Sequence, residues 1–81
     1  MMVNAISAPV AMSTIRARSQ LPPPAERRAI RRRVGATQTE VGALVGVCEQ
    51  TISNYEAGSR SPRGENLIRY VRVLDELRNL A

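Results

Sequence analysis

One short polar segment of this 81-residue sequence has the side chains for recognition chemistry. In the stretch EQTISNY, the spacing puts Ile52 and Tyr55 on one face of a short helix. The rest of the helix surface carries Glu49, Gln50 and Asn54. Lys and Glu are the usual residues of a merely solubilising surface, whereas amides carry the donor and acceptor groups that pair with base edges. The segment therefore indicates a face that could read nucleic acid.

The composition argues against catalysis and against metal binding. There is no His, and Cys48 is the only cysteine, which excludes a disulfide scaffold, a zinc finger and a Cys–His or Ser–His pair within this chain. Glu49 and Glu56 lie seven residues apart, but no nucleophile and no lysine-bearing phosphate loop accompany them. We therefore expect no enzyme activity, no cofactor and no metal.

The charge balance favours a polyanionic partner. The formal net charge is +5, and all 12 basic residues are Arg, whose forked guanidinium is always charged. No stretch approaches the roughly 18 apolar residues of a membrane span. The Arg-rich segment 25–34 also lacks the bulky apolar face of a membrane-surface helix. We expect no membrane partner and a cytoplasmic location, associated with the nucleoid when DNA is bound.

Helical patterns surround the polar segment. Helix formers dominate residues 25–34, with Ala29, Ile30 and Val34 on roughly one face, and Gly35 is suited to end that helix. The pattern becomes helical again from residue 65. This last helix is expected to run to about Leu80, either unbroken or with a hinge near Asp75.

A capping box predicts the helix that precedes the polar segment. Thr37 can cap the amide of residue 40, and Glu40 can reach back to the amide of Thr37. An apolar run over residues 41–45 follows, and Gly46 suits a left-handed turn. Cys48 then stands where the next helix needs its N-cap.

The N-terminal residues differ in composition from the rest. Residues 1–22 are predicted to be a flexible leader and residues 23–81 the folded domain, because three consecutive prolines separate them. An alternative is a basic arm, carrying Arg16 and Arg18, that follows a DNA groove. Met12 is also a plausible initiation point in place of Met1.

Two short helices joined by a glycine-centred turn, with amides on the second, suggest a helix-turn-helix DNA reader. The stretch TQTEVGALVGVCEQTISNYEAGSRSP resembles the phage repressor and Cro-type (XRE) family, whose motif is approximately T-Q-x-x-L-A-x-x-x-G-V-S-x-x-x-I-S-x-x-E-x-G-x-x-x-P. The matching residues are Thr37, Gln38, Val41, Gly46, Val47, Ile52, Ser53, Glu56, Gly58 and Pro62. The resemblance covers about residues 25–75. It implies an all-α fold, a compact four- to five-helix bundle of the lambda-repressor type.

The resemblance also implies roles for individual residues on double-stranded DNA. The helix over residues 49–56 would lie in the major groove. Base-reading positions would be Glu49, Gln50 and Asn54. Positions near the DNA backbone would be Gln38, Thr51, Ser53, Arg60 and Arg63. Arg31 and Glu56 match a pair that joins two helices, which we interpret as a structural ion pair.

The chain departs from the family pattern at several positions. Ala is usual at Gly42, and Leu is usual at Ala36 and Gly64, so the core is expected to be thin. Cys48 replaces a Ser or Thr N-cap, and a thiol is a poor acceptor. We expect Cys48 to be a small, half-buried cap rather than a redox switch. The domain should then be a marginal monomer that gains stability from DNA or a partner.

Two functions fit these features. The first is a Cro-like or repressor-like transcription regulator that binds a palindromic operator as a homodimer. The leucines that could form the dimer surface, or could instead complete the core, are Leu44, Leu74, Leu77 and Leu80. The alternative is an antitoxin that binds a toxin partner and its own promoter. A neighbouring toxin-like reading frame would favour the antitoxin.

Overall fold

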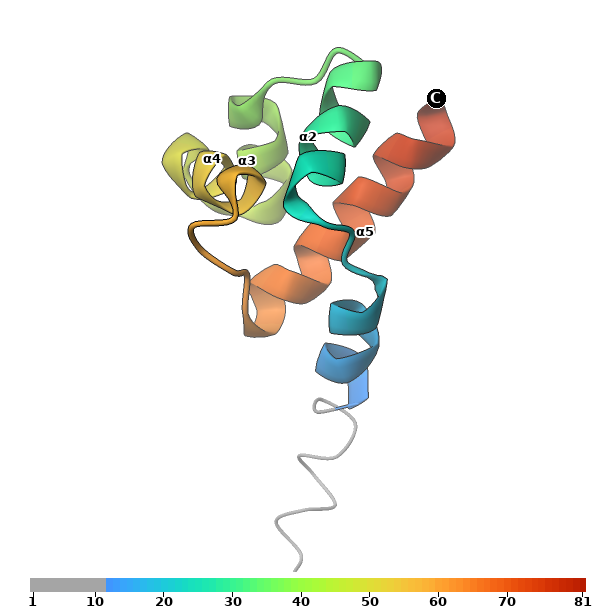
Figure 1. Cartoon of the computed structure of the whole chain (residues 1–81), viewed down its shortest axis with the longest axis vertical. Coiled ribbons are helices and arrows are strands. Elements are labelled where there is room, and N and C mark those ends of the chain that lie inside the picture. Colours follow the sequence, from blue (N-terminus) through green and yellow to red (C-terminus); the bar gives the residue numbers. More distant parts are fainter. Residues whose placement is uncertain (1–11) are drawn as a thin grey trace, which may run out of the picture.

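Helices account for most of the computed structural model, which describes residues 12–81. Four have defined bounds: α2 (Pro24–Arg33), α3 (Gln38–Val45), α4 (Glu49–Ala57) and α5 (Gly64–Leu80). Residues 12–20 are also helical and are called the N-terminal helix below. Figure 1 shows α2, α3 and α4 on one side of α5, with the N-terminal helix beneath them. No strand occurs in the described range, and the predicted all-α class is confirmed.

The core lies between α5 and the three shorter helices. The largest fully buried side chains are Tyr70, Ile30, Ile52, Leu74, Val41 and Val45. The rings of Tyr55 and Tyr70 lie 5.0 Å apart and are tilted by 42°, which joins α4 to α5. The buried hydroxyl of Tyr70 has no hydrogen-bond partner among the described residues, and burial raises its pKa.

The C-terminal helix α5 is continuous over 17 residues, without a hinge near Asp75. Leu74 and Leu77 lie on either side of that position and are both buried in the core, which holds the two halves of α5 against the same neighbours. These two leucines therefore complete the core. Leu44 and Leu80 are 64% and 75% exposed and are the leucines left free on the surface.

The start of α3 and the turn that joins α3 to α4 both have the predicted geometry. The Oγ1 of Thr37 accepts from the amide of Glu40 at 3.0 Å, and the Glu40 carboxylate accepts from the amide of Thr37 at 2.8 Å. Gly46 ends α3 with φ of 94°, a left-handed conformation that favours glycine. Cys48 is the N-cap of α4 but makes no side-chain cap hydrogen bond.

Gly42 lets the turn fold back tightly on α3. Its carbonyl oxygen accepts from the amides of Gly46 and Val47, at 2.7 and 2.8 Å. A Cβ atom at Gly42 would lie 2.6 Å from the backbone oxygen of Val47, so Ala cannot enter without a backbone shift. The glycine is thus required by the close approach of the turn.

Gly42→Ala is therefore expected to lower the free energy of unfolding by about 1–2 kcal/mol. Relief of the clash costs about 2–3 kcal/mol, the upper part of the range for overpacking because a backbone atom must move, and alanine regains about 1 kcal/mol of helix propensity. Urea denaturation measures the difference. Thr39→Ala, at an exposed position of the same helix, is the control and should be neutral or slightly stabilising. A Gly42→Ala variant as stable as the parent would contradict this account of the turn.

The helix α2 begins at Pro24, where the run of prolines ends, and ends at Arg33. Its buried face differs from the expected one: Ile30 is buried, but Ala29 is exposed and Arg27 takes the second buried position. An arginine can occupy this position because the neighbouring backbone supplies acceptors for its guanidinium, as described below. The C-cap is Val34, and Gly35 follows with φ of 73°.

The N-terminal helix differs from the prediction that residues 1–22 form a flexible leader. Ala17 is 5% exposed and packs in a cluster with Leu67 and Val71 of α5, since its small side chain lets the two helices approach. The helix ends before the prolines, which also separate it from α2. The part of the prediction that concerns residues 1–11, including a start at Met1, lies outside the described residues. No helix in the described range is long and apolar enough to cross a membrane.

Candidate nucleic-acid interface

The outward face of α4 carries the polar side chains that the sequence singled out. Ile52 and Tyr55 are 0% and 3% exposed and fix the inner face of the helix in the core. Glu49 and Gln50 are exposed, and Asn54 is half-buried one turn after Gln50. The Nε2 of Gln50 donates to the Oδ1 of Asn54 at 3.2 Å, so the two amides lie side by side. The structure brings these amides together on an accessible surface.

Glu56 anchors the same helix from its opposite face. Its carboxylate is 1% exposed and forms two hydrogen bonds with Arg31, from Nε to Oε2 at 2.5 Å and from Nη2 to Oε1 at 2.9 Å. Arg28 adds an ion pair at 3.5 Å, and Arg31 also donates to the carbonyl of Ala36 at 2.9 Å. The expected structural pair of Arg31 and Glu56 is therefore present, within a larger network that joins α2 to α4.

The network holds the Glu56 carboxylate in its charged form. Burial alone would raise its pKa, but hydrogen bonds from Arg31 and Gln38 and the charges of Arg31 and Arg28 outweigh burial. The pKa of Glu56 is consequently below its ordinary value of 4.5, whereas the same hydrogen bond raises the pKa of Arg31.

The stabilisation that the Glu56 carboxylate supplies is expected to disappear in acid. Because its pKa is lower in the folded than in the unfolded chain, the contribution is present above pH 4.5 and is lost as the pH falls through the folded pKa. Thermal unfolding between about pH 6 and pH 3 measures this loss. Glu56→Gln has no charge to lose at this position, so its melting temperature should fall less over the same interval. An equal fall in both proteins would contradict the assignment.

Arg27 is a structural residue that the sequence analysis did not single out. Its Nε donates to the carbonyl of Pro22 at 2.7 Å, and its Nη1 donates to the carbonyl of Tyr55 at 2.9 Å. The second acceptor lies in the last turn of α4, where carbonyls lack helical partners and the helix dipole attracts a cation. Position 27 precedes Ile30 by three residues, so helical spacing could have placed it on the buried face.

Gln38, which the family resemblance places near the DNA backbone, is the first residue of α3. Its side chain, however, donates from Nε2 to the Oε1 of Glu56 at 3.1 Å. The side-chain amide thus belongs to the network that holds α4, and its remaining N–H is the group left for a phosphate. The first turn of α3 also presents free backbone amides and the positive end of the helix dipole, and both attract a phosphate.

The loop from Gly58 to Arg63 lies directly after α4. Gly58 ends the helix with φ of 78°, and the amide of Ser59 donates to the carbonyl of Asn54 at 3.1 Å, which holds the loop against the helix. Arg60 and Arg63 are exposed and form no ion pair in the described part of the chain. Both line an open hollow of about 690 Å³, together with Tyr55, Gly58, Ser59, Ser61 and Asn66. Ser61 and Asn66 are additional polar groups that the sequence analysis missed.

The start of α4 presents a thiol and a hydroxyl. Cys48 is exposed, not half-buried as expected, because the turn leaves its side chain pointing away from the core. Its Sγ lies 3.2 Å from the Oγ1 of Thr51, and hydrogen bonding with Thr51 lowers the pKa of the thiol. Thr51 and Ser53, both expected near the DNA backbone, are half-buried on α4.

A family model described as helix-turn-helix matches residues 28–77, which is more than half of the chain. The chain belongs to the helix-turn-helix family. It is accordingly a DNA-binding protein of the class of transcription regulators. The matched range contains α3, α4 and the loop with its arginines, whereas the N-terminal helix lies before it. No curated protein and no solved structure gives a significant match.

In this helix-turn-helix protein, Arg63→Ala is expected to weaken binding to every DNA sequence alike. An exposed arginine that neutralises one phosphate releases about one counterion, so the plot of log affinity against log salt should lose about one unit of slope. Titrations of one DNA duplex at several salt concentrations measure the slope. Arg72→Ala, an equal charge change on α5, is the control. A slope change shared by both variants would place Arg63 outside the contact surface.

Proposed function

We propose that this protein is a sequence-specific regulator of the Cro or repressor type, which reads an operator with Glu49, Gln50 and Asn54 of α4. The observation that carries the proposal is that α4 has one accessible polar face and one face fixed to the rest of the fold. Its amides lie together on the accessible face, while the opposite face is clamped to α2 by Arg27 and Arg31. A clamped helix keeps the amides at a fixed orientation, as base reading requires.

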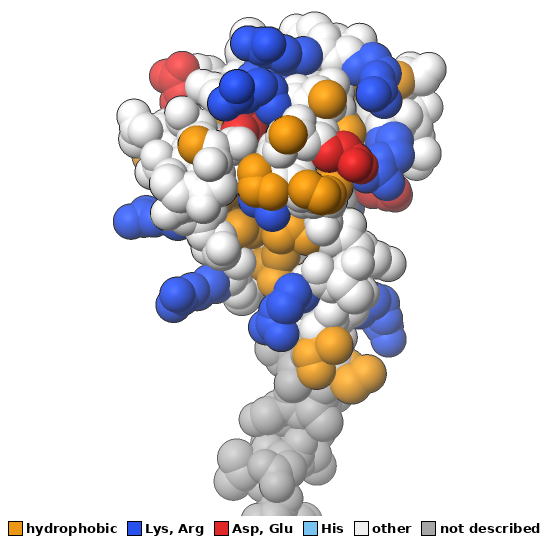
Figure 2. All heavy atoms as spheres, in the orientation of Figure 1, with side chains coloured by type: hydrophobic (Ala, Val, Ile, Leu, Met, Phe, Trp, Pro, Cys, Tyr) orange, Lys and Arg blue, Asp and Glu red, His pale blue; other side chains and the backbone are white. Residues whose placement is uncertain are grey.

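Each amide suits a particular base contact. Gln50 and Asn54 can each pair with an adenine through a bidentate amide, which accepts from N6 and donates to N7. Glu49 can accept from the amino group of a cytosine, or can orient a neighbouring arginine. The loop carrying Arg60 and Arg63 would bind phosphates and fix the register of α4 on the duplex. On the face seen in Figure 2, basic side chains outnumber acidic ones, which suits a polyanion.

The length of α4 favours a dimeric complex. Nine residues make a helix of about 13 Å, which spans only about four base pairs. We infer that two copies bind a palindromic operator with half-sites about one helical turn apart. Leu44 and Leu80 are the exposed leucines that could contribute to contact between copies. The antitoxin alternative keeps the same DNA-reading face and adds a toxin partner.

Selection of bound oligonucleotides from a random pool tests the proposal. The full chain should enrich one sequence, and inverted symmetry in it would report two copies on one site. A symmetric site with the half-site spacing of about 10 base pairs is the expected result. A pool that stays random after repeated rounds, at a salt concentration where the protein binds DNA, would contradict sequence-specific reading.

A further inference from the structure

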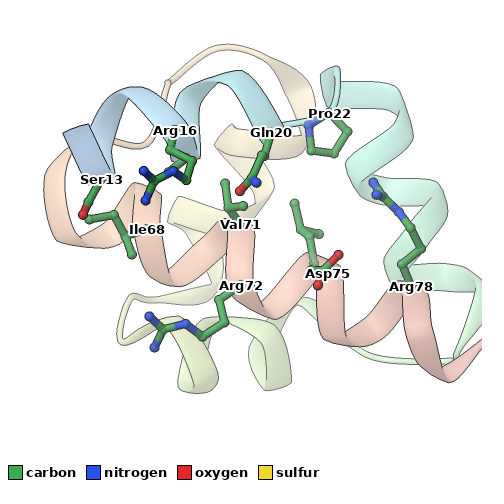
Figure 3. A pocket seen from close by; sticks show the side chains of 11 residues that line it. Ser13, Arg16, Gln20, Pro22, Ile68, Val71, Arg72, Asp75 and Arg78 are labelled. Carbon is green, nitrogen blue, oxygen red and sulfur yellow. The ribbon is translucent and has the colours of Figure 1, made fainter. Parts of the chain in front are cut away.

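A groove of about 630 Å³ runs between the N-terminal helix and α5. Its apolar lining includes Ile68, Val71 and Leu74 of α5 and Ala17 of the N-terminal helix. Figure 3 shows side chains of the N-terminal helix, among them Arg16, reaching down towards α5 from the other wall. Ile68 is only half-buried, so part of this lining remains open to an occupant.

The charged residues of the groove are mostly basic. Arg16, Arg72 and Arg78 line it together with a single acid, Asp75. Arg78 pairs with Glu26 at 3.5 Å, whereas Arg16, Arg72 and Asp75 have no ion pair within residues 12–81. Two exposed arginines without ion pairs thus lie at the groove: Arg16 reaches towards α5, and Arg72 extends from α5 on the side away from the N-terminal helix (Figure 3).

The groove is separate from the DNA-reading face. All of its lining residues come from the N-terminal helix, from Pro22 and from α5; α3, α4 and the loop 58–63 contribute none. One wall, the N-terminal helix, also precedes residues 28–77, which the helix-turn-helix family model matches. An occupant of the groove would therefore leave α4 accessible to DNA.

We propose that this groove binds an acidic amphipathic helix of a partner protein. Such a helix would set its apolar side chains on the half-buried Ile68, above the buried Val71, and pair its carboxylates with Arg16 and Arg72. Met12 and Ile15, on the same helix as Arg16, are also half-exposed, although neither lines the groove itself. A second copy of this chain is a poorer occupant, because its own charge is +5 and its groove carries the same arginines. DNA supplies negative charge but no apolar side chains for the groove lining. The bound partner would be held at the operator together with the DNA.

Selection from a displayed library of random peptides tests this proposal, with the DNA-free full chain as bait. The enriched peptides should combine Asp or Glu with apolar residues at helical spacing. Arg16→Glu with Arg72→Glu should weaken their binding at least tenfold. The matched control, Arg32→Glu with Arg33→Glu, makes the same charge change at exposed positions of α2 and should change it less than threefold. Thermal unfolding of both variants checks that they remain folded.

Three results would overturn the proposal. The first is a library in which no enriched peptide is sensitive to the change at Arg16 and Arg72. The second is an equal loss of peptide binding in the control variant, since this would show that the peptides are attracted only by the net charge of the chain. The third is a dimer of the DNA-free chain that the Arg16 and Arg72 changes abolish, because the occupant would then be a second copy. Nuclear magnetic resonance shifts at the methyl groups of Ile68 and Val71, rather than on α4, would support the groove as the binding site.

Discussion

Arg31→Met is expected to lower the free energy of unfolding by about 3–5 kcal/mol, the range for a buried ion pair that loses one partner. Glu56 is 1% exposed and Arg31 is 11% exposed, so water cannot replace the two hydrogen bonds between them. The same substitution also leaves the carbonyl of Ala36 without its donor. A loss of this size is a large fraction of the stability of so small a domain. Urea denaturation measures it.

Arg32→Met is the control for this prediction. Arg32 is the next residue of α2 but is exposed, and its replacement should change stability by no more than about 0.5 kcal/mol. The double variant Arg31→Met with Glu56→Leu should be more stable than Arg31→Met alone, because no buried carboxylate is left with only Arg28 and Gln38 as partners. If the single variant matches the Arg32→Met control, the network does not hold α4 in the way we describe.

Gln50→Ala and Asn54→Ala are each expected to reduce the preference for operator over random DNA by about 1–3 kcal/mol, roughly 5- to 150-fold. The amides are accessible and carry no backbone contact in the fold, so the change should leave non-specific binding nearly intact. The Gln50–Asn54 hydrogen bond of 3.2 Å adds a second expectation. Because removal of one amide frees the other, the two effects should be non-additive. Competition binding of the operator against random DNA measures both quantities.

Ser59→Ala is the control for the amide substitutions, because Ser59 follows α4 and its side chain bonds only to the carbonyl of Asn54 at 3.4 Å. It should retain the preference for the operator. Equal weakening of operator and random DNA by Gln50→Ala would show that the residue binds the backbone and does not read bases.

The helix-turn-helix could be predicted from the sequence because its helix ends depend on residues that are close together in the chain. The capping box of Thr37 and Glu40 and the left-handed Gly46 depend on residues three or four positions apart, which is why pattern alone locates the ends of α3. The link between Arg31 and Glu56 spans 25 residues and was predicted only through the family resemblance. Residue spacing by itself gives no partner for either side chain.

Features that depend on tertiary contacts were harder to predict. Helical spacing relative to Ile30 could have placed Arg27 on the buried face, but its acceptor, the carbonyl of Tyr55, lies 28 residues away, and nothing in the Arg-rich segment predicts that partner. The N-terminal helix depends in the same way on the packing of Ala17 against Leu67 and Val71. The contacts of individual side chains with DNA follow from neither source, because they exist only in the complex, whereas the fold gives only the positions of the side chains.

Oligonucleotide selection repeated with Asn54→Ala tests most directly whether α4 reads bases. Our account predicts that the enriched site keeps its length and symmetry but accepts several bases at one position of each half-site, since one base contact per copy is lost. Base preference should be unchanged at the positions that neither Asn54 nor its hydrogen-bond partner Gln50 contacts. A site identical to that of the unaltered chain, or one degraded evenly along its length, would contradict the assignment of α4 as the reading helix.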